Sequence, residues 1–408
     1  MKPIQTETTE PRRVVIVGGG VAASRCALEL RRLGFDGAVT MLSAEDRLPY
    51  DRTMLSKGML ADPPCELTEL CTPHAYADRS IELRLATRAE QIDARGRRLR
   101  LSDGTDLDYD RLIVCTGGRP VVPAALAHSG AITVREAGDV AALRMRLASC
   151  QTLLVIGAGF IGAEIASSAR ARGIAVTLVE AASAPLVGIL GHEVAARLVG
   201  LHREAGVELR CGSSARAIRR HEAGFEVFLD DGAILRGDGV VLGVGMAPQV
   251  GWLDGFGTPT IGGLITDAWC RTEIPDVLAA GDCARWWHPA YRTTLHVEHW
   301  DTAGRHGAAA AHSVLGLPEP FAPLPFFWSD QHGVKLQWVG YAPEWDSVEV
   351  SDGDHTTGFV ARYYRDGRLA AAFASNRPRA IAAARAELQV QLDQAAEAWT
   401  SAEGAWSR

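Results

Sequence analysis

Short apolar runs that end in glycine, each followed by residues with the apolar spacing of a helix, recur along this chain. The first unit predicts a strand at 14–17, a helix from about Val21 to Leu33 and a second strand at 38–42. A strand, a helix and a strand in succession form a βαβ unit, whose two strands lie parallel in one sheet. The pattern therefore predicts the start of a parallel α/β sheet.

A second unit with the same pattern begins much later in the chain. It predicts a strand at 153–156, a helix at 160–172 and a strand at 174–179. Two further apolar runs with glycine at their ends, 111–117 and 239–245, are predicted to complete the two sheets. The chain is therefore predicted to be an α/β protein with two Rossmann-like dinucleotide-binding domains, as in glutathione-reductase-like folds.

The leading strand of each unit runs into a glycine-rich turn. Glycine lets the backbone approach a pyrophosphate, and the helix that follows supplies unpaired N–H groups. One such turn alone also fits a tight strand-to-helix connection, whereas two copies predict two dinucleotides held face to face, FAD at the first turn and NADH at the second. The candidate residues are Gly18, Gly20, Ala22 and Ala23 for FAD, and Gly157, Gly159, Phe160, Ile161, Gly162 and, on a later strand, Gly245 for NADH.

The positions of the turns and crossover segments along the chain suggest a nicotinamide domain inserted into a flavin domain. Met246-Ala247-Pro248 follows the second sheet as a crossover, and a strand ending in the Gly281-Asp282 turn resumes the first. From Phe326 the pattern changes to short alternating segments and an alanine-rich helix near 379–399. The predicted domains are an FAD-binding domain at 1–112 and 249–324, an NADH-binding domain at 113–248 and a C-terminal α+β domain at 325–408.

Acidic residues near the second strand of each unit are candidates for binding a ribose. Glu180 ends its strand; a carboxylate there accepts hydrogen bonds from a ribose 2′-hydroxyl and repels a 2′-phosphate, which favours NADH over NADPH. The alternative for Glu180 is a solvated acid at a strand end. In the first unit the same count past the turn reaches Met41, and Glu45 is the nearest candidate.

Composition and charge exclude several classes of protein. With 408 residues, 47% of them hydrophobic and 22% charged, the chain can bury two or three cores. A net charge of −7 without a basic tract excludes a nucleic-acid partner. The polar start of the chain lacks a signal-peptide core, and no apolar run is long enough to span a bilayer. We therefore expect a soluble cytoplasmic protein with no membrane contact and no metal site.

The eight cysteines form no closely spaced redox pair, and none lies between Met41 and Lys57, where a flavin-facing thiol would be expected. They are predicted to be reduced and mostly buried, with a Cys65–Cys71 disulfide as the alternative. A disulfide reductase, or an oxidase or peroxidase that works through a flavin-facing cysteine, is therefore disfavoured.

Taken together, the segments resemble the oxygenase-coupled NADH-dependent ferredoxin reductases, the group of putidaredoxin reductase and the reductase component of biphenyl dioxygenase. The likeness covers nearly the whole chain. Beyond the glycine turns it rests on five blocks: Leu48-Pro49-Tyr50-Asp51-Arg52-Thr53-Met54-Leu55-Ser56-Lys57, Cys115-Thr116-Gly117, Leu278-Ala279-Ala280-Gly281-Asp282, Val297-Glu298-His299-Trp300 and Pro325-Phe326-Phe327-Trp328-Ser329-Asp330-Gln331. The chain departs from this group at Thr53 and at Val187-Gly188, which affects loop rigidity and nicotinamide affinity more than the type of reaction. It also departs at Cys115, a change from one small residue to another that is expected to have no effect.

The resemblance implies roles for individual side chains. Lys57 would lie beside the flavin ring, and Glu164 would face the nicotinamide side and pair with it, although a surface acid is the alternative for Glu164. The resemblance also implies that the helix from about Glu298 points its N-terminus at the flavin. The further candidate FAD contacts are Arg52, Thr116, Gly117, Arg135, Gly281, Asp282, Glu298, His299, Trp300 and Trp328. His299 could be structural or a proton shuttle, and Trp328 could lie at the flavin edge or in a core.

The implied reaction is hydride transfer from NADH to FAD, followed by two single-electron transfers to a small iron–sulfur ferredoxin. That ferredoxin would supply a haem monooxygenase or a Rieske oxygenase and would dock on a local basic patch, with the basic residues from Arg47 to Lys57 and Arg285 as candidates. A rubredoxin or other small-carrier reductase is an alternative, as is an NADH-responsive binding protein resembling apoptosis-inducing factor. The chain could be a monomer or a homodimer.

Overall fold

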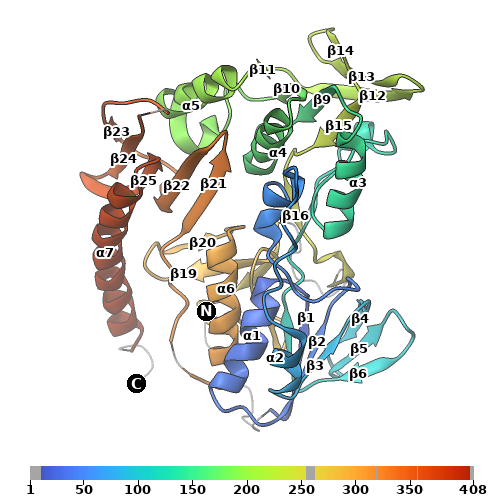
Figure 1. Ribbon diagram of the computed structural model, residues 1–408. Helices are drawn as coiled ribbons and strands as arrows, with labels where there is room; N and C mark the ends of the chain where they lie inside the picture. The colour runs from blue at the N-terminus through green and yellow to red at the C-terminus, as the bar shows by residue number, and fades with distance from the viewer. Residues whose placement is uncertain (1–10, 254–261, 318, 356, 405–408) are drawn as a thin grey trace.

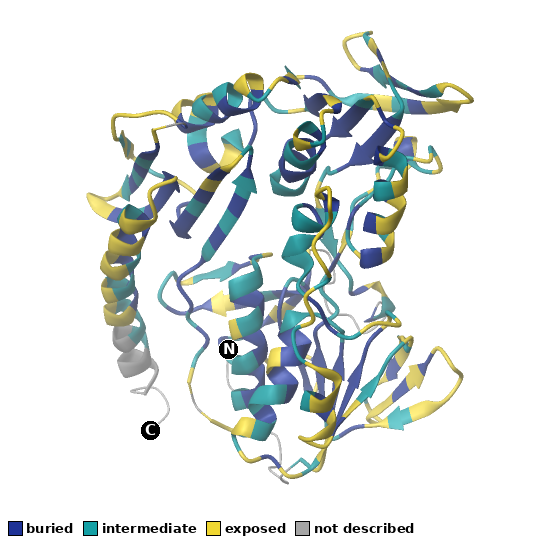
Figure 2. Ribbon diagram, in the orientation of Figure 1, coloured by how far each residue is buried: buried dark blue, intermediate teal, exposed yellow. Residues whose placement is uncertain are grey.

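The computed structural model of the protein describes residues 11–253, 262–317, 319–355 and 357–404. Figure 1 shows the first domain at the bottom, the second at the top right and the C-terminal domain on the left. Strands are largely buried and the outer faces of helices and hairpins are exposed, as Figure 2 shows. Two α/β domains and one α+β domain confirm the predicted fold class.

The first domain is built on a parallel five-stranded sheet. Its strand order is β18 (Val277–Ala279), β7 (Arg111–Val114), β1 (Arg13–Val17), β2 (Ala38–Leu42) and β3 (Ile81–Arg84). Side chains on β1 alternate between the two faces, so Val14 and Ile16 pack under helices whereas Val15 and Val17 pack toward a small antiparallel sheet. That sheet comprises β4 (Ala89–Asp93), β5 (Arg98–Leu101) and β6 (Asp106–Asp108).

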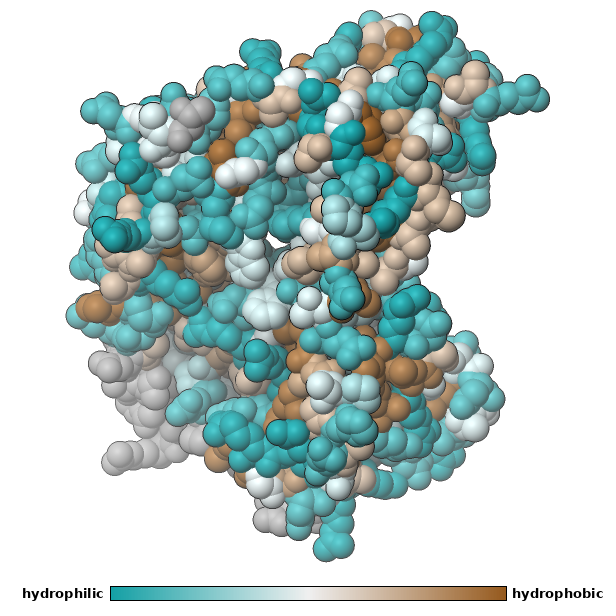
Figure 3. Space-filling model, viewed as in Figure 1, coloured by the Kyte–Doolittle hydropathy of each residue, from teal (hydrophilic) through white to brown (hydrophobic). Residues whose placement is uncertain are grey.

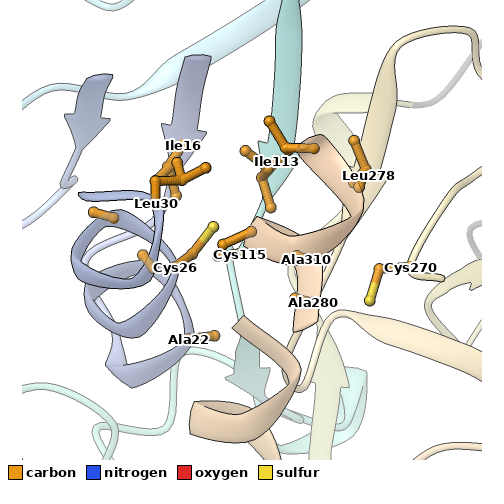
Figure 4. Packing of buried hydrophobic residues seen from close by; sticks show 14 of the residues in the cluster. Ile16, Ala22, Cys26, Leu30, Ile113, Cys115, Cys270, Leu278, Ala280 and Ala310 are labelled. Atoms are coloured by element: carbon orange, nitrogen blue, oxygen red, sulfur yellow. The ribbon is translucent and has the colours of Figure 1, made fainter. Parts of the chain in front are cut away.

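Two helices, α1 (Val21–Arg32) and α6 (Trp300–Val314), cover the other face of the sheet. They pack closely because small residues lie at their crossing: a Cβ added to Gly307 would lie 2.0 Å from the carbonyl oxygen of Ala22. Figure 4 shows this core, where Ile16, Leu30 and Ala310 meet from three elements. The domain also contains α2 (Pro73–Ala77), the short helices η1 (Arg52–Met54), η2 (Gly58–Leu60) and η4 (Gly251–Leu253), and a sheet of β17 (Leu264–Thr266), β19 (Ala284–His288) and β20 (Thr293–Leu295).

The second domain repeats the βαβ plan on a four-stranded parallel sheet. Its order is β11 (Val207–Cys211), β10 (Ala175–Glu180), β9 (Thr152–Ile156) and β15 (Gly239–Leu242). Helices α3 (Ala137–Leu147), α4 (Phe160–Ala171) and α5 (Val187–Glu204) accompany it, with the antiparallel strands β12 (Ala215–His221), β13 (Gly224–Leu229) and β14 (Ile234–Gly237) and the short helix η3 (Ala124–Leu126).

The chain passes between the two domains at a pair of short antiparallel strands, β8 (Gly118–Pro120) and β16 (Met246–Pro248). The crossover predicted at 246–248 lies in this pair. The boundary predicted after residue 112 falls inside β7, all of which belongs to the first sheet, because its residues pair with both β1 and β18. The packing boundary therefore lies after Val114.

The C-terminal domain is an antiparallel sheet with a hydrophobic core on each face. Its order is β21 (Phe326–Gln331), β22 (Val334–Gly340), β25 (Arg368–Ser375), β24 (Phe359–Arg365) and β23 (Ser347–Val350). The helix α7 (Pro378–Gly404) covers one face through Ile381, Ala384 and Leu388. The other face packs on α5 of the second domain, so these two domains share a core.

A kink in α5 fits it to the C-terminal sheet. The backbone of Gly191 has φ +74°, and a Cβ there would lie 2.9 Å from the ring of Trp345. The Tyr363 hydroxyl also donates a hydrogen bond to the carbonyl of Leu190 at 2.9 Å. Glycine at position 191 therefore permits both the bend and the close approach of the aromatic ring.

Figure 3 shows that hydrophilic side chains dominate this face of the molecule, with a notch on the right between the first and second domains. In the described part of the chain, every helix is too short or too polar to cross a membrane.

Candidate active site

A cavity lies where the three domains meet, beside the carboxyl ends of β1 and β18 and the first turns of α4 and α6. Ligands of open α/β sheets bind at such strand ends. The predicted residues that line it are Gly20, Ala22, Arg52, Lys57, Gly117, Arg135, Phe160, Ile161, Glu164, Gly281, Asp282, Glu298, His299, Trp300 and Trp328. The predicted residues outside its lining are Gly18, Ala23, Glu45, Thr116, Gly157, Gly159, Gly162, Glu180 and Gly245.

The first glycine turn has the geometry that a bound pyrophosphate requires. Gly18 has φ +142°, and a Cβ there would lie 2.1 Å from the carbonyl oxygen of Cys115. A Cβ on Gly20 would meet no atom within 4 Å, and Gly20 caps α1 without a side-chain hydrogen bond to the helix. Unpaired N–H groups at the start of α1 therefore face open space in the cavity, which fits the phosphates of FAD.

The second turn repeats this geometry. A Cβ on Gly157, where φ is +100°, would lie 2.3 Å from the carbonyl oxygen of Gly243, and one on Gly162 would lie 2.0 Å from the carbonyl oxygen of Gly157. Gly159 caps α4, and a Cβ there would have the carbonyl oxygen of Gly243 as its nearest neighbour, at 4.0 Å. The two turns therefore play equivalent structural parts in the two domains.

Glu180 is held against the second turn by backbone N–H groups. Its carboxylate accepts hydrogen bonds from Ala158 N at 2.8 Å and Ala182 N at 2.9 Å. A second cavity, of about 300 Å³, lies nearby and is lined by residues that include Ser183, Arg203 and Cys211. The alternative for Glu180 was a solvated acid at a strand end, whereas its carboxylate is held by two backbone N–H groups.

The carboxylate of Glu164 joins the three domains. Its side chain is almost fully buried on α4. Ser56 Oγ donates to Oε2 at 2.5 Å, Lys57 Nζ donates to Oε2 at 2.7 Å, and Ser329 Oγ donates to Oε1 at 2.5 Å. This burial rules out the surface acid that was the alternative for Glu164.

Lys57 reaches Glu164 from a short segment between η1 and η2. Its Nζ also donates to the carbonyl oxygen of Thr53 at 3.0 Å, and the side chain is 21% exposed. Because Lys57 lines the cavity, its ammonium can present positive charge to a bound ring while it stays bonded to Glu164 and Thr53.

The N-terminus of α6 also points at the cavity, with His299 as its N-cap residue. The Nδ1 atom of His299 and the Nε1 atom of Trp300 are buried and have no hydrogen-bond partner in the described part of the chain. Buried polar atoms of this kind usually have partners. These orphaned atoms beside an open cavity fit a bound FAD, whose ring carries hydrogen-bonding groups along its edge.

His299 is suited to a structural role. Burial lowers its pKa to about 4, so the ring is neutral near pH 7. It packs on Phe327 with ring centroids 4.7 Å apart, and Trp300 lies 6.2 Å from Trp328. A neutral, packed ring does not match the proton shuttle that was the alternative for His299.

Several buried histidines predict acid sensitivity. Burial lowers the pKa of His202, His288, His299, His306 and His332 to values of about 3 or 4. Between pH 6.5 and about 4 the unfolded chain binds protons that the folded chain does not. Stability is therefore full above pH 6.5 and is lost as the pH falls to about 4.

Urea unfolding between pH 7.5 and 4.5 checks this prediction. The variant His306→Gln should show a smaller loss of unfolding free energy at acid pH, whereas His74→Gln, at an exposed position, should behave as the parent protein. An equal loss in both variants would contradict the assignment to buried histidines.

At the other end of the cavity, Arg135 and Asp282 form an ion pair whose Nη2 and Oδ2 atoms are 3.5 Å apart. Glu298 lies near this pair; burial, followed by the negative charge of Asp282, raises its pKa. Thr116 instead donates its hydroxyl to the carbonyl of Gln249 at 2.7 Å, at the crossing between the domains. The Thr116 side chain therefore binds the backbone where the chain passes between the two domains, and it does not line the cavity.

Glu45 does not itself line the cavity, but it forms an ion pair with Arg52 at 2.5 Å and accepts a hydrogen bond from the Tyr50 hydroxyl at 2.6 Å, and both of these partners do line it. Ser43 occupies the position that corresponds to Glu180. In the first domain Gly18 N donates to Leu42 O, and in the second domain Gly157 N donates to Val179 O, so the residues that follow, Ser43 and Glu180, are equivalent. The count that reached Met41 was wrong because the segment between helix and strand has five residues in the first unit, 33–37, and three in the second, 172–174.

Sequence reasoning missed some residues of the site. Tyr50, Thr53, Ser56 and Phe327 line the cavity, and Ser329 binds Glu164 from just outside it. The signal was present, because all five lie in the sequence blocks that carry the family resemblance.

All eight cysteines are free, and five of them are buried. Cys115 lines the cavity, but burial raises its pKa well above the usual value, and burial raises the pKa of Cys283 to about 11. Such thiols are poor nucleophiles. In the described residues, no cluster of three or more histidine, cysteine or acidic side chains could hold a metal ion.

One cavity lined by the starts of both α1 and α4, beside the Lys57–Glu164 pair and with all eight cysteines free, defines a flavin-dependent and pyridine-nucleotide-dependent oxidoreductase. Residues 12–307 match the family described as pyridine nucleotide-disulphide oxidoreductase, and residues 326–402 match the family described as reductase C-terminal. The chain belongs to the first family and, within it, to the ferredoxin–NAD(+) reductases.

Individual relatives agree over nearly the full length. The chain is 36% identical to the ferredoxin–NAD(+) reductase component of the anthranilate 1,2-dioxygenase system of Burkholderia cepacia, covering 91% of this chain and 92% of that protein. It is 32% identical to putidaredoxin reductase of Pseudomonas putida, covering 90% and 89%. The solved covalent complex of putidaredoxin reductase with putidaredoxin matches with a TM-score of 0.87 at 29% identity, covering 95% and 98%. These matches confirm the family predicted from the sequence.

Proposed function

We propose that the protein carries electrons from NADH through FAD to a small iron–sulfur ferredoxin, which supplies a monooxygenase or dioxygenase. The observation that carries this proposal is that one cavity is lined by the N-terminal residues of both α1 and α4 and by Lys57 and Glu164. When bound there, FAD accepts a hydride and gives up electrons singly, which converts two-electron into one-electron chemistry.

The residues of the first domain would bind and orient FAD. The start of α1 would bind the phosphates, and Arg135, Asp282 and the first turn of α6 would hold the other parts of the cofactor. Lys57 would stabilise negative charge on the ring, while Glu164 keeps the lysine in place.

The residues of the second domain would bind NADH. The start of α4 would bind its pyrophosphate, and Glu180 would accept a hydrogen bond from a ribose hydroxyl. Phe160 and Ile161 line the cavity on this side and would exclude water beside the nicotinamide. Hydride transfer requires this close and dry contact.

The acceptor is inferred from the relatives, which include a ferredoxin–NAD(+) reductase component of a dioxygenase system and a reductase solved in complex with putidaredoxin. Of the basic residues suggested for docking, Arg52 is bound to Glu45, and Arg47, which is 57% exposed, lies near Asp46. The Nε atom of Arg285 is buried. Arg47 is thus the most accessible of these three. A cytoplasmic location stays a prediction from the sequence.

Stopped-flow absorbance of the FAD-loaded protein tests the proposal. Rapid bleaching by NADH, followed by cytochrome c reduction that depends strongly on an added [2Fe–2S] ferredoxin, is expected. Slow bleaching would argue for a binding protein. Rapid oxygen consumption without a carrier would argue for an oxidase.

Glu180→Ala is expected to lower selectivity for NADH over NADPH about tenfold, because the ribose hydroxyl loses its acceptor and a 2′-phosphate loses a repelling charge. Limiting bleaching rates and half-saturating concentrations for both nucleotides measure this. Glu208→Ala is the matched control, since Glu208 lies on the neighbouring strand β11 and pairs with Arg210 on the surface. Equal selectivity in the two variants would rule out the role of Glu180.

A further inference from the structure

Strand β21 of the C-terminal domain follows one side of α4, the helix that carries Glu164. Phe327 packs edge-on against Phe160 with ring centroids 4.6 Å apart, Ser329 binds Glu164, and His332 N donates to Ser167 Oγ at 2.7 Å. Positions 160, 164 and 167 have the i, i+4, i+7 spacing of one helix face. The contacts therefore form a continuous line between two domains.

Ser329 is placed to donate only to Glu164. It is fully buried, and the Gln331 side-chain amide donates to its oxygen at 3.1 Å. With that oxygen already accepting a hydrogen bond, the hydroxyl hydrogen points to Glu164 Oε1 at 2.5 Å. Gln331 thereby fixes the direction of the Ser329 hydroxyl.

The two oxygens of Glu164 have different partners. Oε2 binds Ser56 and Lys57, both from the first domain, whereas Oε1 binds Ser329. A buried carboxylate oxygen without a donor is costly and draws the nearest cation toward itself. Without Ser329, the carboxylate would therefore hold Lys57 more tightly and farther from the cavity.

We propose that Ser329 is a positioning residue for the flavin site: by satisfying one oxygen of Glu164 it sets how far the Lys57 ammonium projects toward the ring. This inference rests on the proposed function, since it assigns the Lys57 charge to a bound flavin. It gives the C-terminal domain a part in the chemistry through Glu164 and Lys57, since Ser329 itself does not line the cavity.

Ser329→Ala in the FAD-loaded protein tests this role, with the flavin midpoint potential as the first readout. The potential is expected to become more negative, because less positive charge stabilises the reduced ring. The limiting rate of bleaching by NADH should fall about tenfold, the size expected for one hydrogen bond to a charged group, while the half-saturating NADH concentration stays within about twofold. Ser329→Thr keeps the hydroxyl and should restore both values.

Ser375→Ala is the matched control. Ser375 is also fully buried. It lies in the same row of the sheet, because Leu336 pairs with both Ser329 and Ser375. Its hydroxyl has no hydrogen-bond partner in the described residues. It should leave the potential and the rate unchanged. If Ser329→Ala behaves like this control, the proposal is overturned.

The Glu164→Gln background separates positioning from general packing. In the Glu164→Gln protein, Ser329→Ala should not shift the flavin midpoint potential further, because the carboxylate charge that Ser329 stabilises is already absent. A further shift that adds to that of Glu164→Gln would overturn the proposal. Should Ser329→Ala fail to fold, Ser329→Cys, which fills the same space with a weak donor, is expected to give the same shifts. If NADH does not bleach the parent protein at all, the proposed function fails, and the potential alone still decides the role of Ser329.

Discussion

Gly157→Ala is expected to slow reduction by NADH roughly 100-fold while FAD stays bound. An L-residue at φ +100° is strained, and its Cβ would lie 2.3 Å from the carbonyl oxygen of Gly243, so the turn must move. A displacement of about 1 Å at a binding turn can cost roughly 100-fold in rate. The bleaching rate at fixed NADH measures this loss, and the flavin absorbance of the purified protein reports FAD content.

Two glycine variants make this result specific. Gly173→Ala has the same kind of backbone cost, since φ is +79°, but its Cβ would meet no atom within 4 Å, so bleaching should stay near that of the parent. Gly18→Ala alters the first turn and should give protein without FAD. Loss of FAD in Gly157→Ala, or a similar loss of rate in Gly173→Ala, would contradict the assignment of the two turns.

Lys57→Met should slow the bleaching rate roughly 100-fold, the effect of removing one preorganised charge from the site of developing negative charge. It also leaves the Glu164 carboxylate buried without its cation, so the free energy of unfolding should fall by roughly 3 kcal/mol. Stopped-flow absorbance and urea unfolding measure the two effects separately.

The double variant Lys57→Met with Glu164→Gln distinguishes the causes. Removing the stranded charge should recover stability but not the rate. Lys335→Met is the surface control, because Lys335 pairs with Asp330 where both side chains are 40–50% exposed, and it should change neither quantity. A double variant that recovers the rate as well would mean that Lys57 contributes only to folding.

The alternation of buried strands and amphipathic helices was enough to predict the two parallel sheets. Strand β2 has the predicted bounds, 38–42, and α1 and α4 each end one residue before the predicted end. These elements follow from local periodicity and from glycines that the backbone geometry requires. Their ends were less predictable, and β7 stops at Val114 because the chain leaves the sheet before the glycine at 117.

Site residues could be predicted where they lie in a local sequence motif. They could not be predicted where their role depends on contact with a residue far away in the chain. Gly20, Lys57 and Glu164 were all predicted from the sequence as site residues, and all three line one cavity. Ser329 was not assigned, because a serine in a strand looks the same whether its partner is water or a buried carboxylate. Its partner is 165 positions away in the chain. The acid that binds the FAD ribose could not be located by counting along the chain, since two additional loop residues shift the register between the two units.

The C-terminal sheet packs α7 on one face and α5 on the other, and α5 belongs in sequence to the second domain. Exchanging this domain between reductases, as one would to transfer acceptor preference, would therefore pair a foreign sheet with the native α5. The apolar side chains of Leu190, Val194 and Leu198 would then meet a surface that was not shaped for them. A graft that takes residues 187–204 together with the C-terminal domain keeps the shared core intact, so the transferable module is discontinuous in the gene.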